Sequence, residues 1–244
     1  MNLLVSDFDG TYHTGIKDIK LNNIKIQEFI KEGNIFMLSS GRSYNSLKNQ
    51  VEAYGIPVSY LATADGSHLF NKNGVLIHEE LMKNDIKKDI DKILKLNRHK
   101  GIQYDTTREY YKIDLGYNVS SINLVIDEDK INKDFRHEWK KLCKKYKDDY
   151  NFLVYGYDHT YFYCIKEKGI DKATPVEKLS KILTIPKENI FTIGDGDNDV
   201  TMVANYNGYM IGDNETLKKC ALGCYNNVYE MVEDIQKQKI KRRW

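Results

Sequence analysis

Two short acidic segments of this chain could do chemistry, because each of them follows an apolar run. Residues 7–11 (DFDGT) follow Leu3–Val5, and residues 194–199 (GDGDND) follow the run at 189–193. Carboxylates that lie close together repel one another unless a cation lies among them. Carboxylate oxygens suit Mg²⁺, which also binds phosphate groups. The two segments therefore predict a magnesium site that handles a phosphorylated molecule.

A third polar segment supplies groups that bind phosphate. Residues 39–42 (SSGR) follow the apolar run 35–38, and their hydroxyl and backbone N–H groups can donate to phosphoryl oxygens. The amide of Asn198 offers a further donor. A carboxylate beside a bound phosphate can act as a nucleophile and form an aspartyl phosphate. A metal ion would then hold the phosphoryl group and reduce the repulsion between the two anions.

The elements that must position these segments follow from the spacing of apolar residues. Before residue 80, strands and helices are expected to alternate over 3–5, 20–32, 35–38, 43–54 and 58–63. After residue 170, strands are expected at 189–193 and 208–211, and helices at 173–183, 200–205, 216–220 and 228–237. This alternation indicates a parallel sheet covered by helices. Ligands bind such sheets at the carboxyl ends of the strands, so the three polar segments should meet there.

The pattern changes between about residues 80 and 168. Helices are expected at 84–98 and 130–147, and short strands at 102–105, 109–115, 121–126, 152–155 and 161–165. The last two strands are expected to form a hairpin. The sequence therefore predicts an α/β core in two segments with a small α+β domain inserted between them.

Turns, calcium loops and dinucleotide-binding loops also contain Asp and Gly, but the chain matches them less well. Asp and Gly are common in turns, which would account for one such segment but not for several. An EF-hand calcium loop that begins at Asp195 would need Gly and Glu where the chain has Val200 and Tyr206. A dinucleotide-binding fingerprint would need glycine at Asp199. These mismatches favour the metal and phosphate interpretation.

Together the polar segments resemble the four motifs of the haloacid dehalogenase (HAD) superfamily, in order along essentially the whole chain. Residues 7–11 resemble motif I, and residues 39–42 resemble motif II. Lys172 resembles motif III, and residues 194–199 resemble motif IV in the form used by the Cof-type phosphatases of subfamily IIB. The resemblance implies a HAD-like, Rossmann-like parallel-sheet core.

The resemblance also implies the domain organisation and the reaction. Residues 1–80 and 168–244 would form the core, and residues 81–167 would form an α+β cap of the C2B type. The protein would be a phosphoric monoester hydrolase that uses Mg²⁺ and an aspartyl phosphate to hydrolyse small phosphorylated metabolites, with sugar phosphates as the expected class. Two alternatives stay open: a phosphomutase of the phosphomannomutase type, and a non-catalytic regulator that binds phosphate or metal. The acid at Asp9 argues against the regulator, which has no use for an acid–base group.

The resemblance assigns roles at the reacting centre. Asp7 would be the nucleophile and a metal ligand. Asp9 would protonate the leaving oxygen and later activate water, while its backbone carbonyl touches the metal. Asp195 would be the third metal anchor, and Lys172 would neutralise charge on Asp7 and on the phosphate.

Other positions would bind the phosphoryl group or orient its neighbours. The phosphoryl oxygens would be bound by Ser40, Gly41, the Phe8 backbone, Lys172 and Asn198. Asp199 would orient the metal or Lys172. Arg42 would either contact the substrate or brace an acid on the next helix, and the sequence leaves both roles open.

Two positions depart from the family pattern. Ser40 stands where the family usually has Thr, and the hydroxyl is kept. Asp65 stands where relatives often have Asn, followed by Gly66. An extra carboxylate there would repel an anionic substrate or favour one with hydroxyl groups or an amine. The leaving-group preference therefore stays open at this point.

Composition limits the partners. Lys and Arg number 37 against 35 Asp and Glu, a formal net charge of +2, which argues against a nucleic-acid or membrane-surface protein. No apolar run approaches the roughly 20 residues of a membrane span, and no secretory signal is recognisable at Met1–Asp7. The four scattered cysteines are expected to be reduced thiols. We therefore expect a cytoplasmic enzyme, monomeric or weakly homodimeric, whose partner is a small phosphate ester.

Overall fold

The chain folds into two compact units. The computed structural model describes residues 1–83, 86–96, 101–106, 110–112, 119–157 and 159–238. Met1–His78 and Asp171–Trp244 form one unit, called the core unit below, and Glu79–Ile170 form the other, called the inserted unit. The expected fold class, an α/β core with an α+β insertion, is confirmed.

The core unit is built on one mixed sheet. Its described residues form seven strands in the order β12-β11-β1-β2-β3-β4-β5. Their bounds are β1 (Leu3–Asp7), β2 (Ile35–Ser39), β3 (Tyr60–Thr63), β4 (His68–Asn71), β5 (Leu76–Glu79), β11 (Ile190–Gly194) and β12 (Asn207–Met210). The strands from β12 to β3 are mutually parallel, and β4 runs antiparallel to β3. Because β1 lies between β11 and β2, all three polar segments leave the sheet at neighbouring positions, with Asp7 paired to Ser39.

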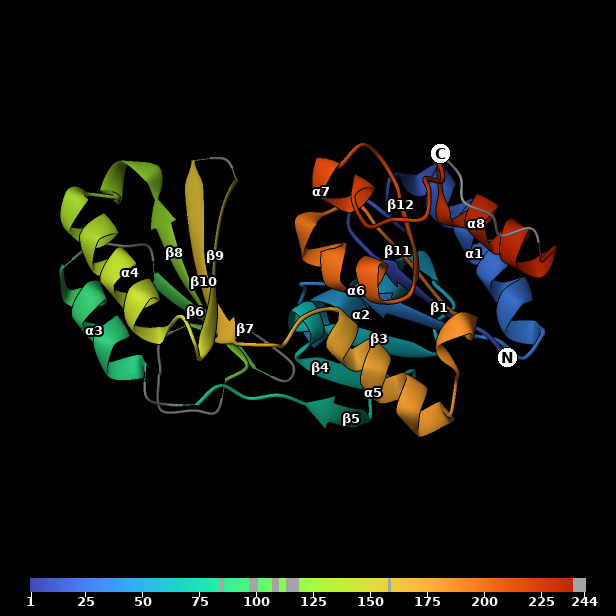
Figure 1. Ribbon diagram of the computed structural model, residues 1–244, viewed down its shortest axis with the longest axis horizontal. Helices are drawn as coiled ribbons and strands as arrows, with labels where there is room; N and C mark the ends of the chain where they lie inside the picture. Colours follow the sequence, from blue (N-terminus) through green and yellow to red (C-terminus); the bar gives the residue numbers. More distant parts are fainter. Residues whose placement is uncertain (84–85, 97–100, 107–109, 113–118, 158, 239–244) are drawn as a thin grey trace. The chain divides into compact units, whose positions relative to one another are not determined.

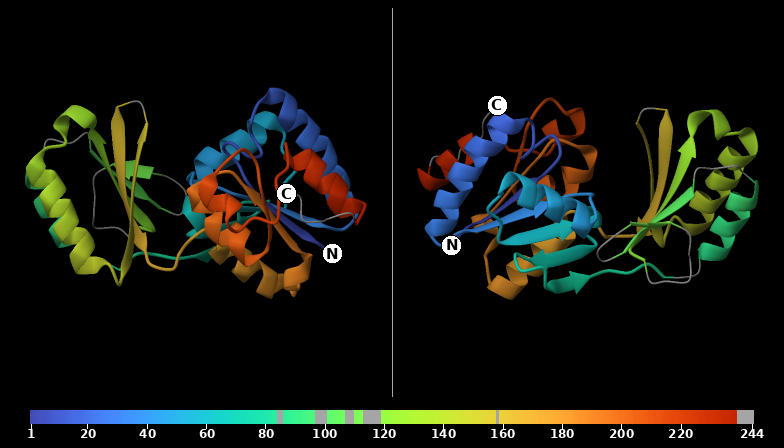
Figure 2. Two further views of the ribbon diagram at one scale, coloured as in Figure 1. Left: turned by 45° about the horizontal axis from the view of Figure 1, so that its top comes forward. Right: turned by 180° about the vertical axis from the view of Figure 1, so that it is seen from behind.

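Helices cover both faces of this sheet (Figure 1). One face packs against α1 (Ile16–Lys31), α2 (Tyr44–Tyr54) and α8 (Val228–Gln236), and the other against α5 (Ala173–Leu183), α6 (Val200–Asn205) and α7 (Glu215–Lys218). Along β1, Leu4 packs on the first face while Leu3 and Val5 pack on the second, as the two-residue repeat of a strand requires. Figure 2 shows α1 and α8 lying side by side on their face. With both faces covered, β1 is buried throughout.

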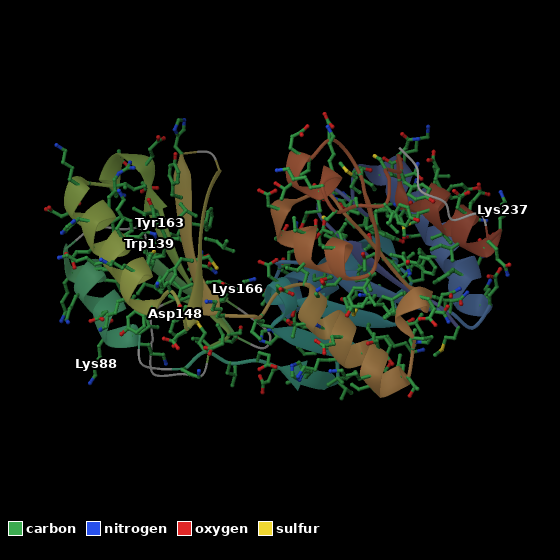
Figure 3. The ribbon with its side chains drawn as sticks, in the orientation of Figure 1. Lys88, Trp139, Asp148, Tyr163, Lys166 and Lys237 are labelled. Carbon is green, nitrogen blue, oxygen red and sulfur yellow. The ribbon has the colours of Figure 1, made fainter. Side chains whose placement is uncertain are left out.

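The inserted unit is an antiparallel sheet with two helices on one face. Its strand order within the described residues is β7-β6-β8-β10-β9. The bounds are β6 (Gly101–Asp105), β7 (Tyr110–Lys112), β8 (Ser121–Asp127), β9 (Tyr150–Tyr157) and β10 (Thr160–Glu167), with α3 (Lys87–Leu96) and α4 (Lys133–Tyr146). Trp139 of α4 packs edge to face on Tyr163 of β10, with ring centroids 4.9 Å apart (Figure 3). This contact anchors α4 to the sheet through a second hydrophobic core.

Several boundaries differ from those expected from sequence. Helix α1 begins at Ile16 rather than at residue 20. The residue before it is Gly15, which has no side chain to cap the helix, so the sequence carries no signal for this start. Strands β4 and β5 are absent from the expected elements, since each is a four-residue segment that mixes apolar with polar side chains. Parts of the expected helix at 84–98 and strand at 109–115 lie outside the described residues. Four single-turn 3₁₀ helices complete the described secondary structure: η1 (Ala64–Gly66), η2 (Glu128–Lys130), η3 (Lys187–Asn189) and η4 (Asp197–Asp199).

Where the chain is described, none of its helices combines the length and the apolar character that crossing a membrane would require.

Candidate active site

A buried ion-pair network lies at the carboxyl end of β1. Asp7 is the last residue of this strand and is only 5% exposed. Lys172 precedes α5, and its buried Nζ donates to Oδ1 of Asp7 at 2.6 Å and to Oδ1 of Asp199 at 2.7 Å. Burial alone would lower the pKa of Lys172, but the charges of Asp7 and Asp199 raise it above its ordinary value. Lys172 therefore stays a cation between two carboxylates.

Three carboxylates at this position could hold a metal ion. Asp7, Asp195 and Asp199 each offer an oxygen, and these oxygens lie within 4.8 Å of one another. Oδ2 of Asp7 is buried and has no hydrogen-bond partner among the described residues. Burial raises the pKa of Asp7 although Lys172 acts in the opposite direction. A buried carboxylate with an unpaired oxygen is costly, and a hard divalent cation such as Mg²⁺ would relieve that cost. The residues present therefore fit this ion.

Asp199 acts mainly as an anchor within this group. Its Oδ1 accepts from Lys172, and its Oδ2 accepts from the backbone N–H groups of Asp195 at 3.0 Å and Gly196 at 2.9 Å. With its oxygens engaged in this way, Asp199 fixes both Lys172 and the loop that carries Asp195. This geometry is compatible with the orienting role expected for Asp199.

Motif I and motif IV touch through Thr11 and Gly10. Oγ1 of Thr11 donates to Oδ1 of Asp195 at 2.5 Å. Gly10 has φ +83°, and a Cβ at this position would collide with the Asp195 carboxylate. Glycine is therefore required by both conformation and space. Sequence reasoning gave Thr11 no role, although its place within motif I pointed to one.

Asp9 lies apart from the carboxylate group. Nε of Arg42 donates to Oδ2 of Asp9, and Nη2 donates to Oδ1, each at 2.7 Å. The two side chains are partly exposed, at 50% for Asp9 and 34% for Arg42. Arg42 thus braces an acid, which was one of its two expected roles, but the acid is Asp9 rather than one on the next helix. Nη1 of Arg42 also donates to Oγ of Ser46, at 3.2 Å.

The expected phosphate-binding residues lie around the ends of β1, β2 and β11. Ser40 is buried, and its Oγ accepts from the backbone N–H of Arg42 at 3.2 Å. Phe8 is fully buried, and its ring packs in the core. Asn198 lies in η4, and its Nδ2 donates to Oδ1 of Asp65 at 3.0 Å. A Cβ at Gly41 would lie 3.2 Å from the same Asp65 oxygen, so the structure places Asp65 beside both residues.

Comparison with known proteins agrees with the motifs. The haloacid dehalogenase-like hydrolase family matches residues 4–222. The chain is 24% identical over 211 residues to the 5-amino-6-(5-phospho-D-ribitylamino)uracil phosphatase of Bacillus subtilis, and the match covers 83% of this chain and 80% of that protein.

Two solved structures share the fold. One is a haloacid dehalogenase-like hydrolase from Bacteroides thetaiotaomicron, at TM-score 0.76 and 20% identity over 96% of this chain and 99% of that one. The other is a HAD subclass IIB sugar phosphatase, at TM-score 0.73 and 14% identity over 97% and 99% of the two chains. Since the family match runs from β1 past α7 and takes in all four motifs, the chain belongs to the haloacid dehalogenase-like hydrolases.

Proposed function

We propose that this protein is a Mg²⁺-dependent phosphatase that hydrolyses small phosphorylated metabolites, sugar phosphates in particular, through an aspartyl phosphate on Asp7. The observation that carries the proposal is the state of Asp7, which is buried, held by Lys172 through one oxygen and without a described partner on the other. The names of two similar proteins, a sugar phosphatase and a ribitylaminouracil phosphatase, support the substrate class.

The metal would be held by Asp7, Asp195 and the backbone carbonyl of Asp9. When bound, Mg²⁺ supplies positive charge that offsets the repulsion between a phosphate ester and an anionic nucleophile. Lys172 contributes to the same end, because it is a buried cation in contact with Asp7. These are the residues on which affinity for the ion should depend.

In the first half-reaction, a carboxylate oxygen of Asp7 bonds to phosphorus while the bond to the leaving oxygen breaks. The leaving oxygen takes a proton from Asp9 and departs as an alcohol. Ser40, Gly41 and Asn198 bind the phosphoryl oxygens with their hydroxyl, N–H and amide groups. Keeping these donors in place before the substrate arrives favours the transition state over the ground state.

In the second half-reaction, Asp9 removes a proton from water, and the resulting oxygen attacks phosphorus. Inorganic phosphate leaves, and the carboxylate of Asp7 and the proton on Asp9 are restored. Both oxygens of Asp9 accept from the Arg42 fork, which sets where this carboxyl group lies. We therefore propose Arg42 as the residue that positions Asp9.

Release of phosphate tests the proposal. Purified protein with Mg²⁺ should hydrolyse para-nitrophenyl phosphate and members of a panel of phosphorylated metabolites, and EDTA should stop the reaction. Asp7→Asn should abolish turnover while circular dichroism shows an intact fold. A protein that releases no phosphate from any ester would contradict the proposal. An isomerised sugar phosphate, formed when a bisphosphorylated sugar is added, would instead indicate a phosphomutase.

We further propose that the boundaries at residues 80 and 168 separate the core from a cap, and that the enzyme works in the cytoplasm as a monomer or weak homodimer. Size-exclusion chromatography coupled to light scattering would measure the oligomeric state. Localisation of a tagged copy in cells would test the compartment.

A further inference from the structure

The turn after β3 holds a carboxylate in a strained conformation beside the candidate active site. Ala64, Asp65 and Gly66 all have positive φ, at 50°, 48° and 99°. Non-glycine residues rarely adopt such angles, although Asp tolerates them better than most. A Cβ at Gly66 would strike the carbonyl of Asp171, so glycine is needed there as well. Strain of this kind concentrates at functional sites, where the surrounding structure maintains it.

Three backbone hydrogen bonds fix this turn against the loop that follows β2. The N–H of Ser40 donates to the carbonyl of Ala62 at 3.0 Å, and the N–H of Ala64 donates to the carbonyl of Arg42 at 2.9 Å. The N–H of Asp65 donates to the carbonyl of Ser40 at 3.1 Å. The position of Asp65 is therefore set by backbone geometry.

The Asp65 carboxylate lies between two residues that we propose to bind the phosphoryl group. Its Oδ1 accepts from Nδ2 of Asn198 at 3.0 Å. A Cβ built on Gly41 would lie 3.2 Å from Oδ1 and 3.3 Å from Oδ2, so the carboxylate lies directly over this glycine. Burial lowers the pKa of Lys172, and the charges of Asp7, Asp199 and, to a smaller extent, Asp65 raise it.

This carboxylate adds negative charge to the site. Asp7, Asp195 and Asp199 already place three carboxylates there. Asp65 adds a fourth acidic side chain, beside the residues that we propose to bind the phosphoryl group. A second anionic group on a bound phosphate ester would then meet a fixed like charge in a partly buried site, where screening is weak. A hydroxyl or ammonium group would instead gain a hydrogen bond to the carboxylate.

We propose that Asp65 selects the substrate by charge, so that the site takes phosphate monoesters with a hydroxyl or ammonium group near the ester oxygen and disfavours those with a second anionic group. The inference rests on the proposed phosphatase function. It concerns which esters are hydrolysed, whereas the reaction itself depends on Asp7, Asp9 and Lys172.

Three esters that differ in one group provide the test: 2-aminoethyl phosphate, 2-hydroxyethyl phosphate and carboxymethyl phosphate. The wild type should hydrolyse the aminoethyl and hydroxyethyl esters with a kcat/KM at least about tenfold above that for the carboxymethyl ester. A factor of this size is expected from the repulsion of one nearby like charge. In Asp65→Asn the ratio should fall to about threefold or less, mainly through a lower KM for the carboxymethyl ester. Asn also tolerates positive φ, so the turn should survive the substitution. A wild type that prefers the carboxymethyl ester would overturn the inference.

Asp213→Asn is the matched control. Asp213 lies exposed in the loop after β12 and forms an ion pair with Lys218 of α7. Replacing it by Asn removes one negative charge, as Asp65→Asn does. This variant should keep the wild-type ranking of the three esters. If it changes the ranking as much as Asp65→Asn does, net charge rather than the position of Asp65 is responsible, and the inference is wrong.

Binding of inorganic phosphate provides a readout without turnover. Titration calorimetry in buffer with Mg²⁺ should show about tenfold tighter binding to Asp65→Asn than to the wild type, since one repulsive charge is gone. Unchanged binding together with an unchanged ester ranking would make Asp65 a structural residue of the turn. If none of the esters nor para-nitrophenyl phosphate is hydrolysed, the proposed function fails, and the calorimetric comparison still decides whether Asp65 excludes anions.

Discussion

Asp9 and Arg42 are 33 positions apart in the chain and form a two-point ion pair, with Nε donating to Oδ2 and Nη2 to Oδ1, each at 2.7 Å. The guanidinium also lies over the ring of Phe8, 5.5 Å from its centroid. Arginine is suited to this geometry because its planar fork matches a carboxylate, which a lysine ammonium cannot do. The pair fixes where the proposed acid–base group rests between reaction steps.

Arg42→Lys keeps the charge and removes the fork, so it should misplace Asp9. General acid catalysis matters most when the leaving group is a poor one. We expect kcat for 2-hydroxyethyl phosphate to fall about tenfold more than kcat for para-nitrophenyl phosphate, whose leaving group needs little protonation. Equal losses on both esters, or a rise in KM alone, would mean that Arg42 binds the substrate directly. Ser46→Ala removes the hydrogen bond that Nη1 of Arg42 donates to Oγ of Ser46 and should leave both rates near wild type.

Gly10→Ala should weaken both the fold and the metal site. The substitution places a Cβ at φ +83° and against the carboxylate of Asp195. Gly33 offers a matched control, because it has φ +84° with nothing within 4 Å of the added Cβ. We expect Gly10→Ala to lose about 1–3 kcal/mol more unfolding free energy than Gly33→Ala, the usual range for overpacking. Calorimetric titration should show that Gly10→Ala binds Mg²⁺ more weakly than the wild type, whereas Gly33→Ala binds it equally well. If both substitutions change stability and Mg²⁺ affinity to the same extent, the contact of Gly10 with Asp195 is contradicted.

Lys172→Met should leave two buried carboxylates without their cation. Removing one partner of a buried ion pair costs about 3–5 kcal/mol, because the remaining charge stays buried and unpaired. Urea unfolding followed by circular dichroism should show this loss, and Mg²⁺ should restore part of it by replacing the missing positive charge. Lys181→Met, in the helix α5 that Lys172 precedes, removes an exposed partner of Glu177 and should leave stability close to wild type. A stable Lys172→Met protein that ignores Mg²⁺ would refute the proposed cation site.

The convergence of the site could be predicted from sequence because it follows from topology. Apolar runs that end at Asp7 and Gly194 place both motifs at the carboxyl edge of adjacent parallel strands, whatever the rotamers of their side chains. Lys172 precedes a helix rather than following a strand, so only its place in the family motif indicated its position.

Several contacts depend on side-chain geometry that no residue spacing encodes. The choice of Asp9 as the partner of Arg42 is a matter of rotamers on two partly exposed side chains. The contact of Asp65 with Asn198 depends on two consecutive non-glycine residues at positive φ, which sequence propensities disfavour. Strands β4 and β5 have only four residues each and mix apolar with polar side chains, so neither shows a periodicity that differs from that of a loop.

His68 should make the core unit lose stability in mild acid. Its side chain lies in β4 with no exposed surface; Nδ1 is 3.3 Å from Oγ1 of Thr63, and Nε2 has no partner in the described part of the chain. Burial, with a smaller effect of His78, lowers the pKa of His68 from 6.5 to about 4. The unfolded chain therefore binds more protons than the folded one between these two values. Stability from neutral His68 is complete above pH 6.5 and is lost as the pH falls towards 4.

The loss from this one group should reach about 2 kcal/mol by pH 5, as the difference between the two pKa values implies. Urea unfolding between about pH 7 and pH 4.5 measures it in the wild type and in His68→Gln, which cannot titrate. The variant should show a pH dependence that is flatter by this amount, even if its stability at neutral pH is lower. Exposed His137→Gln should keep the wild-type slope. If His68→Gln also keeps the wild-type dependence of stability on pH, then His68 is charged or solvated in the folded protein. In that case β4 packs against the core more loosely than the structure shows.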